Sequence, residues 1–446
     1  MAKEACPAAI GDAWHAFIGT GYRVEFDFPS LDDRMGRTNF EIPLLIHHLL
    51  PKGSDRGITP IFAARAMRGF ADGFVAVLLP VYLLEMGLGG VEIGAIATAT
   101  LFGSAFATLA VGAWGHRWTG RSLMLFAAAL MVATGLGFSV LSSFWPLLIV
   151  AFVGTLNPSS GDVSVFLPLE HASLAAASDT ASRTDLFARY ALTGALCAAL
   201  GALASGLPER VVALSGVTKL DALRNMFILY GIVGAVVWAM YRKLPVLAEV
   251  EHAKPAPLGP SRAVVVKLAA LFSVDSFAGG LVVNSLLALW LFQRFGLSLS
   301  AAGAFFFASG LLGAASQLAA PKLAKRVGLI NTMVFTHIPA SMCLIAAAFA
   351  TNVGVALGLL LVRAMVSSMD VPARSAFVMS VVQPHERAAA ASFTVVPRSL
   401  ASAISPLLAG WLFQSGWLAT PLVVCGILKI AYDLALWRAF RLFRHY

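Results

Sequence analysis

Some ionisable residues stand inside long apolar stretches of this sequence, where charge is costly. Three of them are Asp72, Asp275 and Arg363. In a membrane such residues are rare, and they usually serve transport or pair with one another. Desolvation favours the neutral form of a carboxylic acid, whereas a nearby arginine favours its charged form. Asp72 and Asp275 are therefore candidate proton carriers, and Arg363 is a candidate for binding an anionic group of a substrate.

Each of these residues also has a purely structural interpretation. Asp72 stands four residues after Arg68, a spacing at which opposite charges can pair on one helix. Arg363 could be the permanent partner of a buried carboxylate such as Asp275. The sequence leaves these alternatives open.

The apolar stretches that must position these residues set the fold class. The chain of 446 residues is 59% hydrophobic and 12% charged, whereas soluble domains carry about 25% charged residues. Its apolar stretches run for roughly 18 to 25 residues, the length of helix that crosses about 30 Å of hydrocarbon. They lack the alternation of polar and apolar residues that a membrane β-barrel requires. We therefore predict an all-α membrane protein embedded in the lipid bilayer.

Twelve spans can be placed, in two groups of six. Lys and Arg gather in one set of alternate loops, which predicts that both termini lie in the cytoplasm and that the protein crosses the cytoplasmic (inner) membrane. The spans lie near 62–86, 91–114, 121–142, 145–167, 189–207 and 226–243, and then near 266–293, 300–320, 330–351, 353–372, 396–415 and 418–438. The predicted parts are a poorly ordered cytoplasmic extension (1–58), a six-helix bundle (59–244), a cytoplasmic linker (245–262), a second six-helix bundle (263–440) and a basic tail (441–446).

Other functional classes lack their motifs in this chain. The net charge of +9 is spread over loops instead of forming one patch, so nucleic acid is not an expected partner. We find no P-loop, His/Glu metal cluster or nucleophile elbow, and we expect neither enzymatic activity nor a cofactor or metal ion. The cysteines show no spacing suited to disulfides or zinc. They are Cys6, Cys197, Cys343 and Cys425.

The two groups of spans show traces of an internal duplication. Four matches occur at nearly one offset, and a gene duplication should produce such a constant offset. They are Ser159–Val163 with Ser367–Val371 and Gly120 with Gly328, at 208, and Arg189 with Arg398 and Gly201 with Gly410, at 209. The first match makes Asp162 and Asp370 equivalent. Arg363 has Thr155 as its counterpart, so its charge is specific to the second half.

Two parallel repeats of six spans resemble the halves of major facilitator transporters. The loop Gly112–Arg121 resembles a degenerate copy of that family's signature, with His116 where the family usually has aspartate. The second copy, Leu323–Gly328, keeps the basic residues and the glycine and also lacks the acid. The resemblance implies two bundles that rock about a substrate site near the middle of the membrane.

The resemblance also implies roles for particular residues. In the family the signature loop joins a cytoplasmic charge network, and here Asp162 and Asp370 would supply the missing acids. Their expected partners are Arg117 or Arg189 for the first, and Lys325, Arg326 or Arg398 for the second. We predict that these seven residues form a cytoplasmic gate whose pairs break during transport. The alternative is a set of static ion pairs.

The family's first and seventh spans line the central cavity, which would place Asp72, Asp275 and Asn284 there. Together with Arg363, these are the residues we predict for substrate binding or proton coupling. The last span is usually peripheral, so Lys429 and Asp433, four residues apart, are interpreted as a self-neutralised pair.

The sequence therefore predicts a secondary carrier of a small molecule, coupled to protons and acting as a monomer. Proton antiport, with efflux of a drug-like or metalloid-like compound, is favoured over uptake. The alternatives are an uptake carrier for a small metabolite and a membrane receptor or scaffold that keeps the frame without transport.

Overall fold

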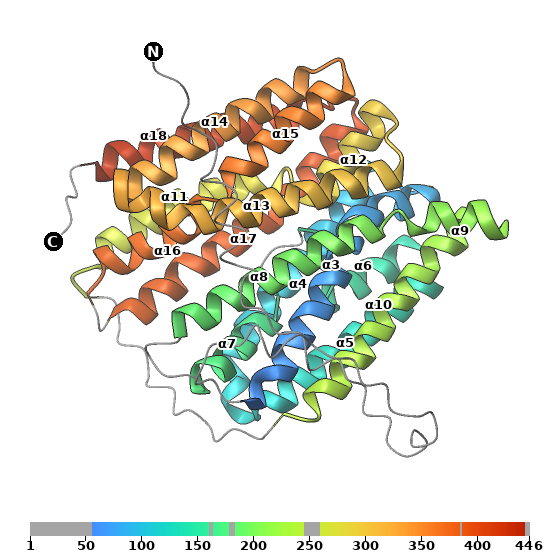
Figure 1. The fold of residues 1–446 in the computed structure, drawn as a ribbon, viewed down its shortest axis with the longest axis horizontal. Helices are drawn as coiled ribbons and strands as arrows, with labels where there is room; N and C mark the ends of the chain where they lie inside the picture. The colour runs from blue at the N-terminus through green and yellow to red at the C-terminus, as the bar shows by residue number, and fades with distance from the viewer. Residues whose placement is uncertain (1–55, 160–163, 178–182, 245–258, 384–385, 442–446) are drawn as a thin grey trace, which may run out of the picture. The chain divides into compact units, whose positions relative to one another are not determined.

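The computed structural model describes residues 56–159, 164–177, 183–244, 259–383 and 386–441. These residues form α-helices joined by short loops, with two short 3₁₀ helices and no β-strand among them (Figure 1). The predicted all-α fold class is confirmed. Almost all of the predicted extension 1–58, most of the predicted linker 245–262 and most of the tail 441–446 lie outside the described residues.

The helices fall into a first half, which ends at α10, and a second half, which begins at α11. The first half contains η1 (Arg56–Ile58), α3 (Thr59–Glu85), α4 (Gly90–Trp114), η2 (Gly115–Arg117), α5 (Gly120–Val140), α6 (Phe144–Val153), α7 (Phe166–Ala176), α8 (Arg183–Ala204), α9 (Leu207–Ser215) and α10 (Lys219–Tyr241). The second half contains α11 (Arg262–Gly280), α12 (Asn284–Phe295), α13 (Leu299–Val327), α14 (Leu329–Phe349), α15 (Val353–Ser367), α16 (Asp370–Val381), α17 (Arg387–Gln414) and α18 (Thr420–Phe440).

Eleven helical stretches in the described part of the chain are long and apolar enough to cross a membrane. The remaining predicted span, near 145–167, is broken: α6 ends at Val153 after ten residues and α7 begins at Phe166. Asn157-Pro158 lies in this break, because proline lacks the N–H that would continue the helix.

Two spans of the second half are also interrupted, which the sequence analysis did not predict. The seventh span divides into α11 and α12 between Gly280 and Asn284, and the tenth divides into α15 and α16 around Ser368. The tenth span is the repeat equivalent of the fourth, so the two halves share a broken helix at the same position. A broken helix exposes backbone groups that must find partners elsewhere.

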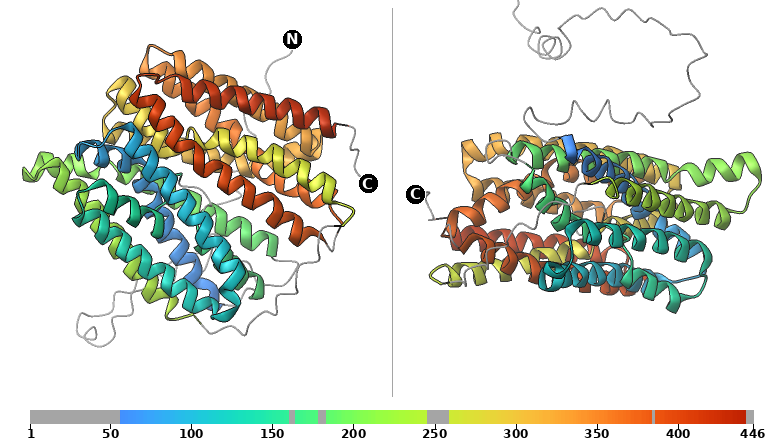
Figure 2. Two further views of the ribbon diagram at one scale, coloured as in Figure 1. Left: turned by 180° about the vertical axis from the view of Figure 1, so that it is seen from behind. Right: turned by 90° about the horizontal axis from the view of Figure 1, so that it is seen from below.

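The first span of each half packs against two helices of its own half, and α3 is largely buried. Helix α3 packs against α8 and α10, and α11 packs against α17 and α18 (Figure 2). Large apolar side chains such as Phe126, Trp145, Phe335 and Ile427 are exposed on the outside of the helices. This distribution suits a chain whose surroundings are lipid.

The two halves meet along two pairs of helices, α4 with α17 and α8 with α13. We call the end where α3 begins and α10 ends the near end, and the end of the loop between α3 and α4 the far end. The close contacts involve glycines at the far end: a Cβ on Gly94 would lie 2.5 Å from the Pro406 carbonyl oxygen, and one on Gly303 would lie 2.6 Å from that of Ala202. Gly94 and Gly303 are repeat equivalents, so both crossings depend on a missing side chain at the same position.

The replacement Gly94→Val should therefore open the far end. Overpacking typically costs about 1–3 kcal/mol, which shifts a two-state population by about 5- to 150-fold. Spin labels at Leu88 and Ser415, one on each half at the far end, should show a larger share of long distances. Gly112→Val is the matched control, because nothing lies within 4 Å of a Cβ at Gly112 on the same helix. Equal distance distributions in the two variants would contradict the role of the crossing.

Candidate functional site

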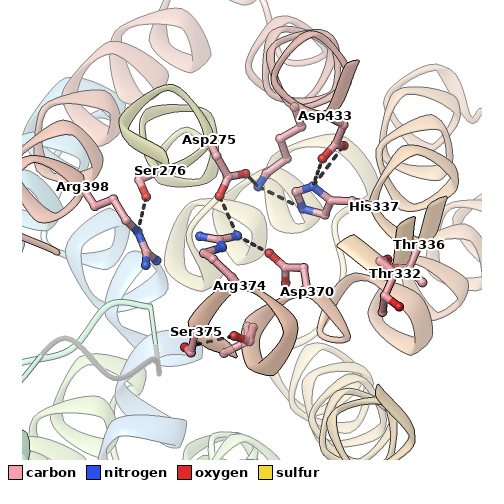
Figure 3. A network of polar contacts seen from close by, with 12 residues as sticks. Asp275, Ser276, Thr332, Thr336, His337, Asp370, Arg374, Ser375, Arg398 and Asp433 are labelled. Carbon is pink, nitrogen blue, oxygen red and sulfur yellow. Dashed lines mark hydrogen bonds and ion pairs between the residues drawn. The ribbon is translucent and has the colours of Figure 1, made fainter. Parts of the chain in front are cut away.

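Each half contains a cluster of charged side chains buried between its helices. The first-half cluster consists of Arg65, Arg68, Asp72, Glu170, Tyr190 and Tyr241. The second-half cluster consists of Asp275, His337, Asp370, Arg374, Arg398, Lys429 and Asp433, most of which are labelled in Figure 3. Charges at such positions are maintained only when they are paired or hydrated. These two clusters are therefore the candidate functional sites.

The first-half cluster is organised around Glu170 of α7, whose side chain is fully buried. Arg68 of α3 forms an ion pair with it, and the hydroxyl groups of Tyr190 and Tyr241 donate hydrogen bonds to its carboxylate, the latter at 2.6 Å. Four helices, α3, α7, α8 and α10, thus converge on one carboxylate. Such complete satisfaction is what a buried charge requires to be tolerated.

Aromatic rings and a second carboxylate complete this cluster. The Arg65 guanidinium lies 5.0 Å from the centroid of the Tyr190 ring, and that of Arg68 lies 4.1 Å from the Phe166 ring. Asp72 lies in the buried core of α3, with 9% of its surface exposed. Two arginines and two carboxylates therefore share this interior, and their charges balance.

The second-half cluster is organised around Asp275 of α11. Its two carboxylate oxygens have different cationic partners: Lys429 Nζ of α18 lies at 2.6 Å and an Arg374 terminal nitrogen of α16 at 2.9 Å. The same Arg374 nitrogen also forms an ion pair with Asp370 (Figure 3). One carboxylate thereby joins the seventh, tenth and twelfth spans.

His337 of α14 extends the cluster. Its Nε2 lies 3.4 Å from Lys429 Nζ, and its Nδ1 lies 3.2 Å from the carboxylate of Asp433. Since an ammonium group can only donate, Nε2 must accept and Nδ1 must carry the proton that it donates to Asp433. In this arrangement His337 is a neutral ring between a cation and an anion.

Two arginines in the interior of the second-half spans have no carboxylate partner among the described residues. Arg398 of α17 donates from Nε to the hydroxyl of Ser276 at 3.0 Å. Arg363 lies in the second half of α15 and forms neither a hydrogen bond nor an ion pair with the part of the chain that the structure describes. Arg363 is therefore not the partner of Asp275, which the sequence left as one alternative.

The broken fourth and seventh spans touch each other across the two halves. The Asn284 side chain donates to the Ser159 carbonyl oxygen, and the Ser285 N–H donates to the Pro158 carbonyl oxygen, both at 3.0 Å. The proline break thus frees a carbonyl group that the start of α12 uses. Asn284, predicted to contact substrate, instead has a structural partner in this state.

Each half also supplies a side chain that caps a helix of the other half at the far end. Glu209 of α9 accepts from the backbone N–H groups of Leu299 and Ser300, at 2.6 and 3.0 Å, where α13 begins. Gln414 at the end of α17 accepts from the Val91 N–H at 2.7 Å, where α4 begins. Oxygen atoms at a helix N-terminus satisfy free N–H groups and complement the helix dipole. These reciprocal caps reinforce the closed far end.

Among the predicted gate residues of the second half, Asp370 does not form the predicted pair. Asp370 pairs with Arg374 of its own helix instead of Lys325, Arg326 or Arg398. Lys325 and Arg326 are in the last turn of α13, partly or fully exposed to solvent. Asp162, whose expected partners were Arg117 and Arg189, lies outside the described residues. Arg189 pairs with the exposed Asp185 at 3.0 Å, and Arg117 lies exposed in η2.

The predicted pair of Lys429 with Asp433 is wrong. Lys429 turns to Asp275, and Asp433 turns to His337. The i, i+4 spacing allowed an ion pair between Lys429 and Asp433 along α18. Both side chains instead contact groups on other helices, α11 for Lys429 and α14 for Asp433. Sequence reasoning also missed Glu170, His337 and Arg374. A signal was available for His337, a lone ionisable residue in an apolar stretch, whereas Glu170 stands next to His171 and Arg374 stands four residues after Asp370.

No group of three or more His, Cys, Asp or Glu side chains in the described part of the chain is arranged to hold a metal ion. Every hydrogen-bond partner described above is a protein group. The arrangement can hold and exchange protons or charges, because Glu170, Asp275 and Asp370 each face a cation that could be released on protonation.

Comparison with known proteins points to one family. A model of the Major Facilitator Superfamily matches residues 61–394. The uncharacterized membrane protein YJR124C of Saccharomyces cerevisiae is 23% identical over 421 residues, covering 86% of this chain and 94% of its own. The structure of the nucleoside transporter NupG has a TM-score of 0.67 at 15% identity, covering 87% of this chain and 100% of that chain. The inward-open xylose transporter XylE from E. coli has a TM-score of 0.65 at 15% identity, covering 85% and 96%.

Proposed function

This chain belongs to the major facilitator superfamily of transporters, and we propose that it is a secondary carrier in which a proton on Asp275 drives the movement of a small solute. The observation that supports coupling is the position of that carboxylate, buried in a membrane-spanning helix between Lys429 and Arg374. An acid in such a place can exist in two states that its cationic partners distinguish.

Protonation of Asp275 would change the packing of three spans at once. The neutral acid no longer attracts Lys429 and Arg374, which lie on α18 and α16. Lys429 keeps His337 within reach, and Arg374 keeps Asp370, so each cation has an alternative partner and need not be left alone. A switch of partners of this kind biases a bistable arrangement of helices. Asp72 is the second candidate proton carrier. It is buried in α3, the first span of the first half, as Asp275 is buried in the first span of the second half.

The contacts between the halves fit one state of an alternating-access cycle. The caps by Glu209 and Gln414 and the crossings at Gly94 and Gly303 all lie at the far end. We place the far end on the outer side of the cytoplasmic membrane, since basic loops predict cytoplasmic termini. The structure would then represent a carrier closed to the outside. A reporter enzyme that works only in the cytoplasm should be active when it is fused after Tyr446. A reporter that works only outside the cytoplasm should be inactive at the same position.

Proteoliposomes with an imposed pH difference test the coupling. A screen of small solutes should find at least one that accumulates several-fold more with the gradient than without it, and a pH-sensitive dye inside the vesicles should report proton movement with that solute. The sign of the dye signal distinguishes antiport, which the sequence predicts together with export, from symport. Transport that is indifferent to pH would remove proton coupling, and a chain that moves none of the solutes would favour a receptor or scaffold.

A further inference from the structure

One cation of the second-half cluster has no carboxylate partner. The cluster contains three cations, Arg374, Arg398 and Lys429, and three carboxylates, Asp275, Asp370 and Asp433. Asp275 and Asp370 pair with Lys429 and Arg374, and Asp433 bonds to the neutral ring of His337. Among the described residues, Arg398 is left with the hydroxyl group of Ser276. A cation without a paired carboxylate in a membrane-spanning interior calls for an anion or for water.

The cation that lacks a carboxylate partner lies next to Arg374. Arg398 lies near Arg374, so two guanidinium groups approach each other (Figure 3). Both carboxylates of this region already serve Arg374 and Lys429, and Asp433 is bonded to His337 on the other side of the cluster. Arg398 therefore has only a hydroxyl as a partner.

The N–H groups of these two arginines that lack partners are held in place by contacts of the same guanidinium groups. The bond from Arg398 Nε to Ser276 Oγ fixes the plane of the guanidinium and leaves both terminal nitrogens without a hydrogen bond in the described residues; they carry no dashed line in Figure 3. Arg374 is 7% exposed, and its Nε is buried with no hydrogen-bond partner. A buried donor without a partner loses its hydration without gaining a hydrogen bond, which is unfavourable. A planar fork of this kind matches the two oxygens of a carboxylate or a phosphate.

We propose that Arg398, with Arg374 beside it, binds an anionic group of the transported solute, so that the carrier takes organic anions bearing a carboxylate or a phosphate. The proposal rests on the proposed transport function and adds the charge class of the substrate to it. It also gives Arg398 a role different from the cytoplasmic gate that the sequence predicted.

Pairs of solutes that differ only in charge test this assignment. The probes are glycerol 3-phosphate against glycerol and benzoate against benzamide, added to the purified full-length protein while its melting temperature is followed. We expect at least one anion to raise the melting temperature, and its neutral counterpart to leave it unchanged. The phosphate and carboxylate arms show which of the two groups the site takes.

Three variants assign the effect to the fork. Arg398→Gln should weaken the anion's apparent affinity by about tenfold or more, since a charge-assisted bidentate contact is lost. Arg398→Lys keeps the charge without the fork and should fall between. Arg294→Gln, an exposed arginine at the end of α12, should bind as wild type does. Size-exclusion profiles and the melting temperature without solute check that each variant folds.

Two results would overturn the proposal. The first is a lack of charge selectivity: the neutral member of a pair stabilises the protein as much as the anion does, or Arg398→Gln binds the anion as tightly as wild type does. The second is a lack of binding: neither anion raises the melting temperature at concentrations up to about 10 mM, which would fill a millimolar site. Failure here is separate from failure of proton coupling: if solute movement in proteoliposomes still depends on the pH gradient, the carrier function stands and only the anionic substrate class falls.

Discussion

Asp275→Asn should abolish proton-driven accumulation of solute, with a loss of about 100-fold or more. The amide cannot carry a proton, and it leaves Lys429 and Arg374 without the charge that both contact. Removing one partner of a buried ion pair costs roughly 3–5 kcal/mol, and each 1.4 kcal/mol is about tenfold. The measurement is the initial rate of gradient-driven uptake or release in proteoliposomes, for a solute found in the screen.

A second assay separates a proton carrier from a structural residue. Exchange of labelled for unlabelled solute across the membrane needs no net proton movement, so Asp275→Asn should retain it if the carboxylate serves coupling. Asp275→Glu should restore part of the driven transport. Asp433→Asn is the matched control, because this buried carboxylate of the same cluster bonds to His337 and to no other residue that the structure describes. If driven transport in Asp275→Asn equals that of wild type, Asp275 is not the coupling group.

The second large effect concerns stability. Glu170→Leu should lower the free energy of unfolding by about 3–5 kcal/mol, because Arg68 is left charged in a buried position and two tyrosine hydroxyls lose their acceptor. Denaturant titration of the purified protein, followed by circular dichroism, measures the change.

Two further variants show whether burial is the cause. In Asp185→Asn an exposed ion pair with Arg189 is removed, and the change should stay below about 1 kcal/mol. The double variant Arg68→Met/Glu170→Leu replaces the whole pair by apolar side chains, which is often close to neutral for a buried pair. It should therefore be more stable than Glu170→Leu alone. If Glu170→Leu costs no more than Asp185→Asn, Asp72 must serve as an adequate counter-ion for Arg68.

The two clusters illustrate two uses of buried charge within one duplicated frame. Glu170 is enclosed by partners from three other helices, which suits a fixed element. The partners of Asp275 each have a second group within reach, Asp370 for Arg374 and His337 for Lys429. Charges with alternative partners can be exchanged at low cost, which suits a moving element.

The sequence by itself determined the membrane location, the helical class, the approximate spans and the duplication. These follow from local properties, because the length and composition of each apolar stretch decide whether it crosses lipid. The position of Asn157-Pro158 likewise determined one break, since proline acts on its own helix. Single charges in apolar stretches marked Asp72, Asp275 and Arg363 as residues in need of explanation.

Only the tertiary structure decided which charges meet. Lys429 and Asp433 fit each other by spacing, yet they pair with Asp275 and His337, because the rotation of α18 turns both side chains toward other helices. Asp370 and Arg398 both belong to the internal repeat, and Arg398 is one of the partners that the sequence predicts for Asp370. In the structure Asp370 pairs with Arg374, and Arg398 bonds to Ser276. Contacts between helices depend on their rotation, their breaks and the close approach at glycines. Hydropathy and spacing along one chain carry none of that information.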